Sequence, residues 1–369
     1  HALVSRLDDY LVHQIAEPVA YPATSDRNFY DRYYFGCHDT EGKLFLMLAF
    51  GQYPNLGVTD AFVSVVYEGK QHVVRASREL GLDRMDTHIG PLGVEVVEPT
   101  RRLRIYCEPN EWGLEYDITF EARVEGYLEP RFYRRSAGRV TQDYVRTTQT
   151  GRYSGWIKVA GRRIELTADR YWGQRDHSWG IRGIGDPDPS LVRPPAPGMV
   201  GTFFWNWACM QFPDHTLLYT VSEEADGTRW NDSSVRLPGL AGGGEVQHYQ
   251  SHHNLEFISG SRQFKRASIE LTAKDGAVTK VDCEPLMVLW MSGCGYGGDW
   301  RHGQYHGPLA VEGMTYDLSN ADDLRKLAGI HETVCRFSAD GEVGYGIFEM
   351  LVAGVYPRYG FNTPRDVAP

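Results

Sequence analysis

The sequence predicts an all-β protein, built from two antiparallel β-barrel or sandwich units side by side, with few short helices. Aromatic residues make up 12% of the chain, with 22 Tyr and 9 Trp, and there are 40 Gly. This composition is typical of strands, tight turns and aromatic-lined pockets. Turn-forming residues recur roughly every 8–12 residues, the spacing expected of a sandwich or barrel. Because 42% of the 369 residues are hydrophobic, the chain can bury a substantial core.

The first half of the chain reads as a strand series after one short helix. That helix is expected at 8–15, ended by Pro18 and Pro22. Alternation of apolar and polar residues between turn residues then predicts strands at 30–36, 43–50, 62–68, 71–75, 94–98, 103–108, 115–125, 150–159 and 163–171.

The clearest boundary is 183–198, where five prolines forbid regular structure. We therefore expect one domain at 1–190 and a second at 191–369, each a barrel. Strands resume beyond the boundary at 202–212, 216–223, 247–258, 267–272, 278–283 and 344–355. One further helix is expected, with Asn320 as its N-cap and Gly329 at its end.

Charge and cysteine content exclude several classes of function. The net charge of −10 and the pI near 5.7 argue against a nucleic-acid partner, which would require a basic face. No apolar run approaches the ~18–20 residues of a transmembrane segment, and no signal peptide is visible. The six cysteines are scattered without a Cys-x-x-Cys pair, which indicates reduced thiols rather than disulfides or a zinc site. We expect a cytoplasmic protein without a bound metal.

Residues 169–182 are the most unusual stretch, because charged residues, aromatics and glycines follow a regular strand. On an extended backbone Arg175, His177 and Trp179 share one face, while Asp176 and Ser178 face the other way. His177 can transfer protons near neutral pH without a large pKa shift. It is therefore a candidate acid or base at the rim of a cavity. The alternative is a structural histidine held by Asp169 or Asp176.

The segment 203–207 follows the proline-rich boundary and is strongly aromatic. Alternation places Phe204 and Asn206 on one face and Trp205 and Trp207 on the other. Such a strand can line an apolar pocket with one amide that orients a polar group. The alternative is core packing around a hydrogen-bonded asparagine.

The glycine-rich loop 293–307 contains Asp299 and His302, which are candidate proton carriers over a pocket. The loop lacks the lysine and the strand–loop–helix context of a phosphate site, so nucleotide binding is not expected. The chain also lacks the Gly-x-Ser-x-Gly and His-Glu-x-x-His motifs of serine hydrolases and zinc proteases.

With Asp169, Trp172, Gly173, His177 and Trp179 in view, the chain resembles the carotenoid 1,2-hydratase/AttH-like superfamily. The resemblance implies two lipocalin-like β-barrels and cofactor-free chemistry on an apolar, often isoprenoid or polycyclic, substrate. Relatives hydrate an isolated double bond, and fungal relatives guide pericyclic ring closure. The hydratases also carry a tyrosine and an aspartate two residues apart on the first strand after the domain junction.

At that position this chain has Phe204 and Asn206, and an asparagine cannot donate a proton as a carboxylic acid does. The chain therefore departs from the hydratases at this position, and His177, Asp299 and His302 are the candidates for another acid.

We expect an enzyme that acts on a terpenoid, steroid or polyketide-like molecule by acid–base chemistry: hydration, dehydration, isomerisation or cyclisation. His177 would be the acid or base, Asp169 or Asp176 would orient it, and Asn206 would position a water or a hydroxyl. The expected substrate-binding residues are Trp172, Trp179, Phe204, Trp205, Trp207, Trp290, Asp299 and His302.

Two other functions fit the same residues. A non-catalytic lipocalin-like carrier would return its apolar ligand unchanged. A pericyclase-like scaffold would need shape and hydrogen bonds but no titrating group. The sequence leaves open whether the protein forms a homodimer.

Overall fold

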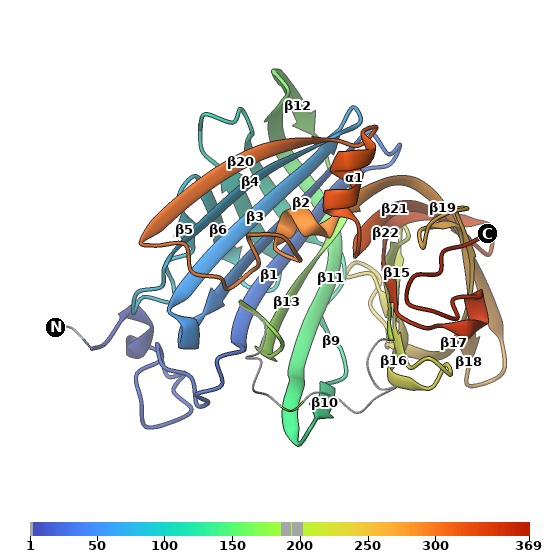
Figure 1. Ribbon diagram of the computed structural model, residues 1–369, viewed down its shortest axis with the longest axis horizontal. Coiled ribbons are helices and arrows are strands. Elements are labelled where there is room, and N and C mark those ends of the chain that lie inside the picture. The colour runs from blue at the N-terminus through green and yellow to red at the C-terminus, as the bar shows by residue number, and fades with distance from the viewer. Residues whose placement is uncertain (1–2, 186–192, 194–201) are drawn as a thin grey trace.

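The computed structural model describes residues 3–185, 193 and 202–369, and it is all-β as predicted (Figure 1). The strands fall into two antiparallel systems, one built mainly from the first half of the chain and the other from the second. Each therefore has a sheet that must bury an apolar face, and each does so by curling around its own core.

The first system is a 14-stranded sheet of the described residues, with the order β20-β4-β3-β2-β1-β13-β11-β8-β7-β6-β5. Three further strands, β9, β10 and β12, pair with the long β11. The bounds are β1 Phe29–Asp39, β2 Leu44–Tyr53, β3 Val58–Tyr67, β4 Lys70–Glu79, β5 His88–Ile89, β6 Leu92–Glu98, β7 Arg102–Cys107, β8 Glu115–Ala122, β9 Tyr127–Leu128, β10 Phe132–Ser136, β11 Arg139–Val159, β12 Arg162–Leu166, β13 Tyr171–Ile181 and β20 Leu309–Asp317.

The second system is a closed barrel in which β14 pairs with both β15 and β22. Its strands are β14 Phe203–Gln211, β15 His215–Glu223, β16 Arg229–Pro238, β17 Gln247–Phe257, β18 Phe264–Ala273, β19 Val278–Trp290, β21 His331–Ala339 and β22 Glu342–Ala353. Closure removes the free edges that an open sheet exposes. The interior is filled by buried side chains such as Phe204, Met210, Ile269 and Phe348.

A third buried cluster lies between the two barrels and joins them. It combines outward-facing residues of the first sheet, such as Tyr34 and Met47, with outward-facing residues of the second barrel, such as Trp205, Trp207 and Leu289. Successive residues of a strand point to opposite faces. The strands at this junction are therefore buried on both faces, one toward their own barrel and one toward the neighbour.

Strand β20 departs from the simple division into two halves. Although it lies late in the chain, it pairs along its whole length with β4, so it completes the edge of the first sheet (Figure 1). The short helix α1 (Ala321–Leu327) follows it and leads back into the second barrel. The boundary at residue 190 stays a prediction, and β20 is a segment of the second half that crosses to the first sheet.

The helix predicted to start after Asn320 is present as α1. The Asn320 side chain caps it by accepting hydrogen bonds from the backbone N–H groups of Asp322 and Asp323. The helix predicted at 8–15 is wrong. Only a 3₁₀ turn forms, η1 at Arg6–Asp9, because the carboxylate of Asp8 accepts bonds from the backbone of Ser5 and Val19 and folds the segment back on itself.

The remaining 3₁₀ turns are η2 Pro54–Leu56, η3 Met291–Cys294 and η4 Pro357–Tyr359. All six cysteines are buried and free. In the part of the chain that the structure describes, no helix has the length and apolar character needed to cross a bilayer.

Candidate active site between the two barrels

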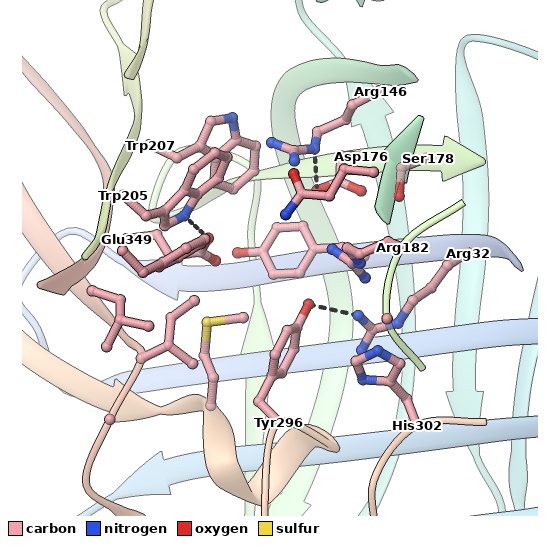
Figure 2. A pocket seen from close by; sticks show the side chains of 18 of the residues that line it. Arg32, Arg146, Asp176, Ser178, Arg182, Trp205, Trp207, Tyr296, His302 and Glu349 are labelled. Carbon is pink, nitrogen blue, oxygen red and sulfur yellow. Dashed lines mark hydrogen bonds and ion pairs between the residues drawn. The ribbon is translucent and has the colours of Figure 1, made fainter. Parts of the chain in front are cut away.

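A cavity of about 510 Å³ lies where the outer face of the first sheet meets the outer face of the second barrel (Figure 2). Strands β1, β11 and β13 supply one wall, and β14 and β22 supply the opposite wall. Residues after β19, including Met291, Tyr296 and His302, close a third side. Pockets of this size hold molecules as large as a typical drug.

Asp176 of β13 points into this cavity (Figure 2). Burial raises the pKa of its carboxyl from 3.8 to about 6, the charge of Arg146 opposes this shift, and the nearby carboxylates of Glu129 and Glu349 add to it. No described residue donates a hydrogen bond to Asp176, and its nearest cation is Arg146 Nε at 3.8 Å. A carboxyl in this state can give or take a proton near neutral pH.

Arg146 of β11 is held in place by several neighbours. Its Nη1 lies 3.6 Å from Glu129 Oε2, and both side chains are almost fully buried. Glu129 in turn accepts hydrogen bonds from Thr148 at 2.6 Å and Thr220 at 2.8 Å. The Arg146 guanidinium also lies over the rings of Phe132, Trp205 and Trp207, with its Cζ 5.1, 5.2 and 5.2 Å from their centroids. It is therefore a fixed cation beside Asp176.

A second carboxyl, Glu349 of β22, lines the same end of the cavity. The indole Nε1 of Trp205 donates to its Oε2 at 2.5 Å. Directly across the strand pair is Glu332, whose pKa is raised well above its usual range by burial and by the charge of Glu349. Tyr34 donates to Glu332 Oε1 at 2.6 Å. This end of the cavity is therefore acidic and aromatic.

The other end of the cavity is cationic and carries Arg32 and Arg182 (Figure 2). Arg32 Nη1 donates to the Tyr296 hydroxyl at 2.6 Å. The Cζ of Arg182 lies 4.8 Å from the centroid of the Tyr30 ring. Beside them His302 hydrogen-bonds through Nδ1 to the carbonyl of Gly295 at 2.9 Å, and burial, followed by the charges of the two arginines, lowers its pKa well below the usual range.

Four of the residues predicted from the sequence line this cavity: Asp176, Trp205, Trp207 and His302. The predicted face alternation of β13 is correct, since β13 pairs in register with β1 and β11 over this stretch. Arg175, His177 and Trp179 consequently lie on the opposite face from Asp176.

His177 and Trp179 line a different cavity, of about 500 Å³, which the N-terminal segment 7–24 helps to form at one end of the first barrel. His177 Nε2 lies 2.5 Å from Asp31 Oδ1. The carboxyl that holds His177 is thus Asp31, not Asp169 or Asp176, because those two side chains belong to an exposed turn and to the other face of the strand. A catalytic role for His177 stays a prediction.

Phe204 and Asn206 face the interior of the second barrel rather than a cavity. Asn206 Nδ2 donates to the Tyr219 hydroxyl at 3.1 Å, and the Phe204 ring stacks on His253 and Tyr356. Both side chains are fully buried. This is the core packing that the sequence left open as an alternative.

The remaining predicted residues also lie outside the inter-barrel cavity. Trp172 is buried against Arg152, whose Cζ lies 3.5 Å from its ring centroid, and it donates to the carbonyl of Asp169. Trp290 contacts His331 and a third surface cavity. Asp299 is exposed.

The sequence reading missed the residues that give the cavity its charge: Arg32, Arg146, Arg182 and Glu349. Arg32 lies between Tyr30 and Tyr34 on one face of β1, and Arg146 follows Tyr144 on one face of β11, which is a usable signal for a buried polar face. Glu349 gave none, because a single carboxyl in the apolar run of β22 resembles an exposed position. Among the described residues, ligand atoms of Asp214, His215 and Glu342 lie within 4.8 Å of one another, a spacing that could hold a metal ion. These three residues do not line the cavity.

A family model described as "Family of unknown function (DUF8625)" matches residues 4–362. No curated protein is detectably similar in sequence. The structure of an AttH-like protein from Nitrosomonas europaea shares 16% identity and a TM-score of 0.50, over 93% of this chain and 98% of that chain.

Two other solved structures are similar. Kievitone hydratase from Nectria haematococca has 10% identity and a TM-score of 0.43, over 87% of this chain and 88% of its own. CghA has 8% identity and a TM-score of 0.46, over 88% of each chain. The predicted likeness to the carotenoid hydratase/AttH-like superfamily is confirmed at the level of the fold.

Proposed function

This chain belongs to a family of unknown function, DUF8625, and we propose that it is a cofactor-independent enzyme acting in the inter-barrel cavity by acid–base chemistry. Its substrate would be a hydrophobic terpenoid, steroid or polyketide-like molecule, and the reaction a hydration, dehydration, isomerisation or cyclisation. The observation that carries the proposal is Asp176, a carboxyl with a pKa of about 6 that accepts no hydrogen bond from the described residues and faces an aromatic cavity.

The proposed chemistry assigns proton transfer to Asp176. In a hydration, protonated Asp176 gives its proton to one carbon of a double bond, a water oxygen bonds to the other carbon, and the surplus proton of that water returns to Asp176. The reverse sequence eliminates water. An acid with a pKa near the working pH serves both directions, because its protonated and deprotonated forms are then both well populated.

Arg146 and Glu349 support this chemistry electrostatically. Arg146 keeps the pKa of Asp176 from rising further, so that the carboxyl remains able to lose its proton. The ring faces of Trp205 and Trp207 hold the Arg146 guanidinium. A positive charge that develops on the substrate would therefore be stabilised by the carboxylates of Asp176 and Glu349 rather than by these rings.

The packing of both barrels favours an enzyme over a lipocalin-like carrier. A carrier of that kind holds its ligand inside a barrel. Here the second barrel is filled by buried side chains such as Met210 and Ile269. The first is filled by side chains such as Leu46 and Ile105, except for the cavity of about 500 Å³ at one end. The inter-barrel cavity instead carries a titratable carboxyl that accepts no hydrogen bond from the described residues, which simple ligand storage does not require.

The test is turnover by the wild type and by Asp176→Asn, which keeps the shape of the side chain and removes its proton. Each protein is incubated with a collection of apolar isoprenoid and polyketide compounds, and products are sought by liquid chromatography and mass spectrometry. We expect products that differ from a substrate by one water, or by retention time alone, with the wild type, and at least a 100-fold lower rate with the variant.

The matched control is Asp282→Asn, which removes an exposed carboxylate on β19 and should leave turnover unchanged. A substrate that the wild type converts should also show kcat/KM changing with pH through about 6, falling above this value if Asp176 donates the proton and below it if Asp176 accepts. Full activity in Asp176→Asn would refute the assignment.

A further inference from the structure

The cationic end of the cavity has fewer negative partners than its charge requires. Arg32 is 5% exposed, and its hydrogen-bond acceptors are neutral: the Tyr296 hydroxyl at 2.6 Å and the carbonyl of Cys294 at 3.4 Å. Its Nε has no partner among the described residues. Asp60 lies close enough to influence Arg32, but burial raises the pKa of Asp60 to about 7, so this carboxyl carries only part of a charge at neutral pH.

Arg182 is likewise held by neutral groups. Its guanidinium lies over two tyrosine rings, with Cζ 4.8 Å from the Tyr30 centroid and 5.6 Å from the Tyr144 centroid. Within residues 3–185, 193 and 202–369, no carboxylate oxygen comes within 4.0 Å of Arg182 or Arg32. Two guanidinium groups that face one cavity with no described carboxylate in direct contact are costly, because each is partly removed from water and each repels the other.

The neighbours of the two arginines add a specific hydrogen-bonding pattern. His302 is neutral and its Nδ1–H donates to the carbonyl of Gly295, so its Nε2 is left as an acceptor; this buried atom has no partner among the described residues. The Tyr296 oxygen accepts from Arg32, which leaves the hydroxyl hydrogen of Tyr296 free to donate. The group that fits the arginines and Tyr296 offers negatively charged oxygens, whereas His302 Nε2 can only accept and therefore requires a donor such as a hydroxyl or a water.

We propose that Arg32 and Arg182 bind an anionic oxygen group, a carboxylate or an enolate, on an otherwise hydrophobic substrate. This rests on the proposed function, since it concerns the same cavity, and it adds the chemical class of the substrate. The anion lies on the side of the cavity that carries Arg32 and Arg182, away from the carboxylate of Glu349 on the opposite side (Figure 2). The charge pattern therefore sets the orientation of the substrate and brings its apolar skeleton to Asp176.

The test is equilibrium binding, which needs no turnover. Quenching of tryptophan fluorescence reports occupancy, because Trp205, Trp207 and Trp230 line the cavity. The probes are 2-naphthoate with its methyl ester for the carboxylate class, and 4-hydroxycoumarin with 4-methoxycoumarin for the enolate class. We expect at least one acidic probe to bind the wild type about 10- to 100-fold more tightly than its neutral partner, the value of a charge-assisted hydrogen bond.

Arg182→Gln and Arg32→Gln should each reduce this preference by about 10-fold or more, and Arg182→Lys should keep part of it. Because Arg32 is buried and its variant could unfold, Arg182→Gln is the decisive variant. Arg365→Gln removes an exposed arginine and is the matched control, with no expected change. Equal binding of acidic and neutral probes by the wild type, or an unchanged preference in Arg182→Gln, would overturn the proposal.

Two further variants separate this proposal from its alternatives. Asp176→Asn should lose turnover but keep the preference for the anion, so loss of one property without the other shows which proposal fails. Asp186 and Asp188 follow Arg182 in sequence and lie outside the described residues. If the acidic probes were preferred only by the double variant Asp186→Asn/Asp188→Asn, these two aspartates would be neutralising the arginines in the wild type. The proposal would then be wrong.

Discussion

Asp176 should make the folded protein less stable at neutral pH than an uncharged residue would. Its carboxyl has an ordinary pKa of 3.8 and a pKa of about 6 in the folded protein, mainly because of burial. A carboxyl whose pKa is raised on folding contributes stability that is complete below about pH 3.8 and is lost as the pH rises through about 6. An asparagine at this position resembles the protonated acid at every pH, so Asp176→Asn should not lose this contribution.

The size of the effect follows from the two pKa values. They differ by about two, and a difference of one corresponds to about 1.4 kcal/mol. The variant should therefore be more stable than the wild type by up to about 3 kcal/mol above pH 7. The difference should shrink steadily below pH 6, because the wild-type carboxyl then becomes protonated in the folded state as well.

Urea unfolding followed by tryptophan fluorescence, at intervals between about pH 4.5 and pH 8, measures this difference. Asp282→Asn, which removes an exposed carboxylate, is the control and should change the profile little. Parallel stability profiles for the wild type and Asp176→Asn would show that the folded protein does not raise the pKa of Asp176, and the acid–base proposal would lose its basis. A variant that is more stable but inactive is the expected combination for a group kept for function.

Three other substitutions probe the neighbouring structure. His177→Gln should change kcat/KM for a substrate of the inter-barrel cavity less than twofold, because His177 lines the other cavity. A large loss would indicate that His177, not Asp176, is the catalytic acid. Arg146→Met should destabilise the protein by about 3–5 kcal/mol in urea unfolding, since it leaves Glu129 as a buried and unpaired charge, and adding Glu129→Gln should recover part of the loss. Asn206→Ala should cost about 1–3 kcal/mol, because the buried Tyr219 hydroxyl loses its partner, without affecting turnover.

The fold was accessible from the sequence because its main determinant is local. Alternating residues between turn residues identify strands wherever one face is buried, and Asn320 with the acidic first turn identifies the only α-helix of the described residues. The pairing of β20 with β4 was not accessible. A strand late in the chain that crosses to the first sheet leaves no local trace, because its pattern would be the same beside any other edge.

The candidate site was only partly accessible, and the reason lies in the two strands that were singled out. In β13 both faces are polar: Arg175 and His177 point one way, and Gln174 and Asp176 the other. In β14 both faces are apolar, with Phe204 inside the barrel and Trp205 toward the neighbouring sheet. Period-two alternation sorts residues into two sets, but in these strands it does not say which set meets a cavity.

Side-chain packing explains, for both strands, which face meets the cavity. The filled interior of the second barrel has no room for a substrate. A buried charge is tolerated only where a partner or solvent-filled space can compensate it. The junction of two curved surfaces leaves such a space, because convex faces cannot meet along their whole area. The face that carries Asp176 and the face that carries Trp205 are the two that meet at this junction. In a double barrel, the residues that line the inter-barrel cavity are therefore expected on the outward face of each strand, between the residues that point into the barrel. His177 and Asn206 lie on the inward faces, so they do not line the inter-barrel cavity.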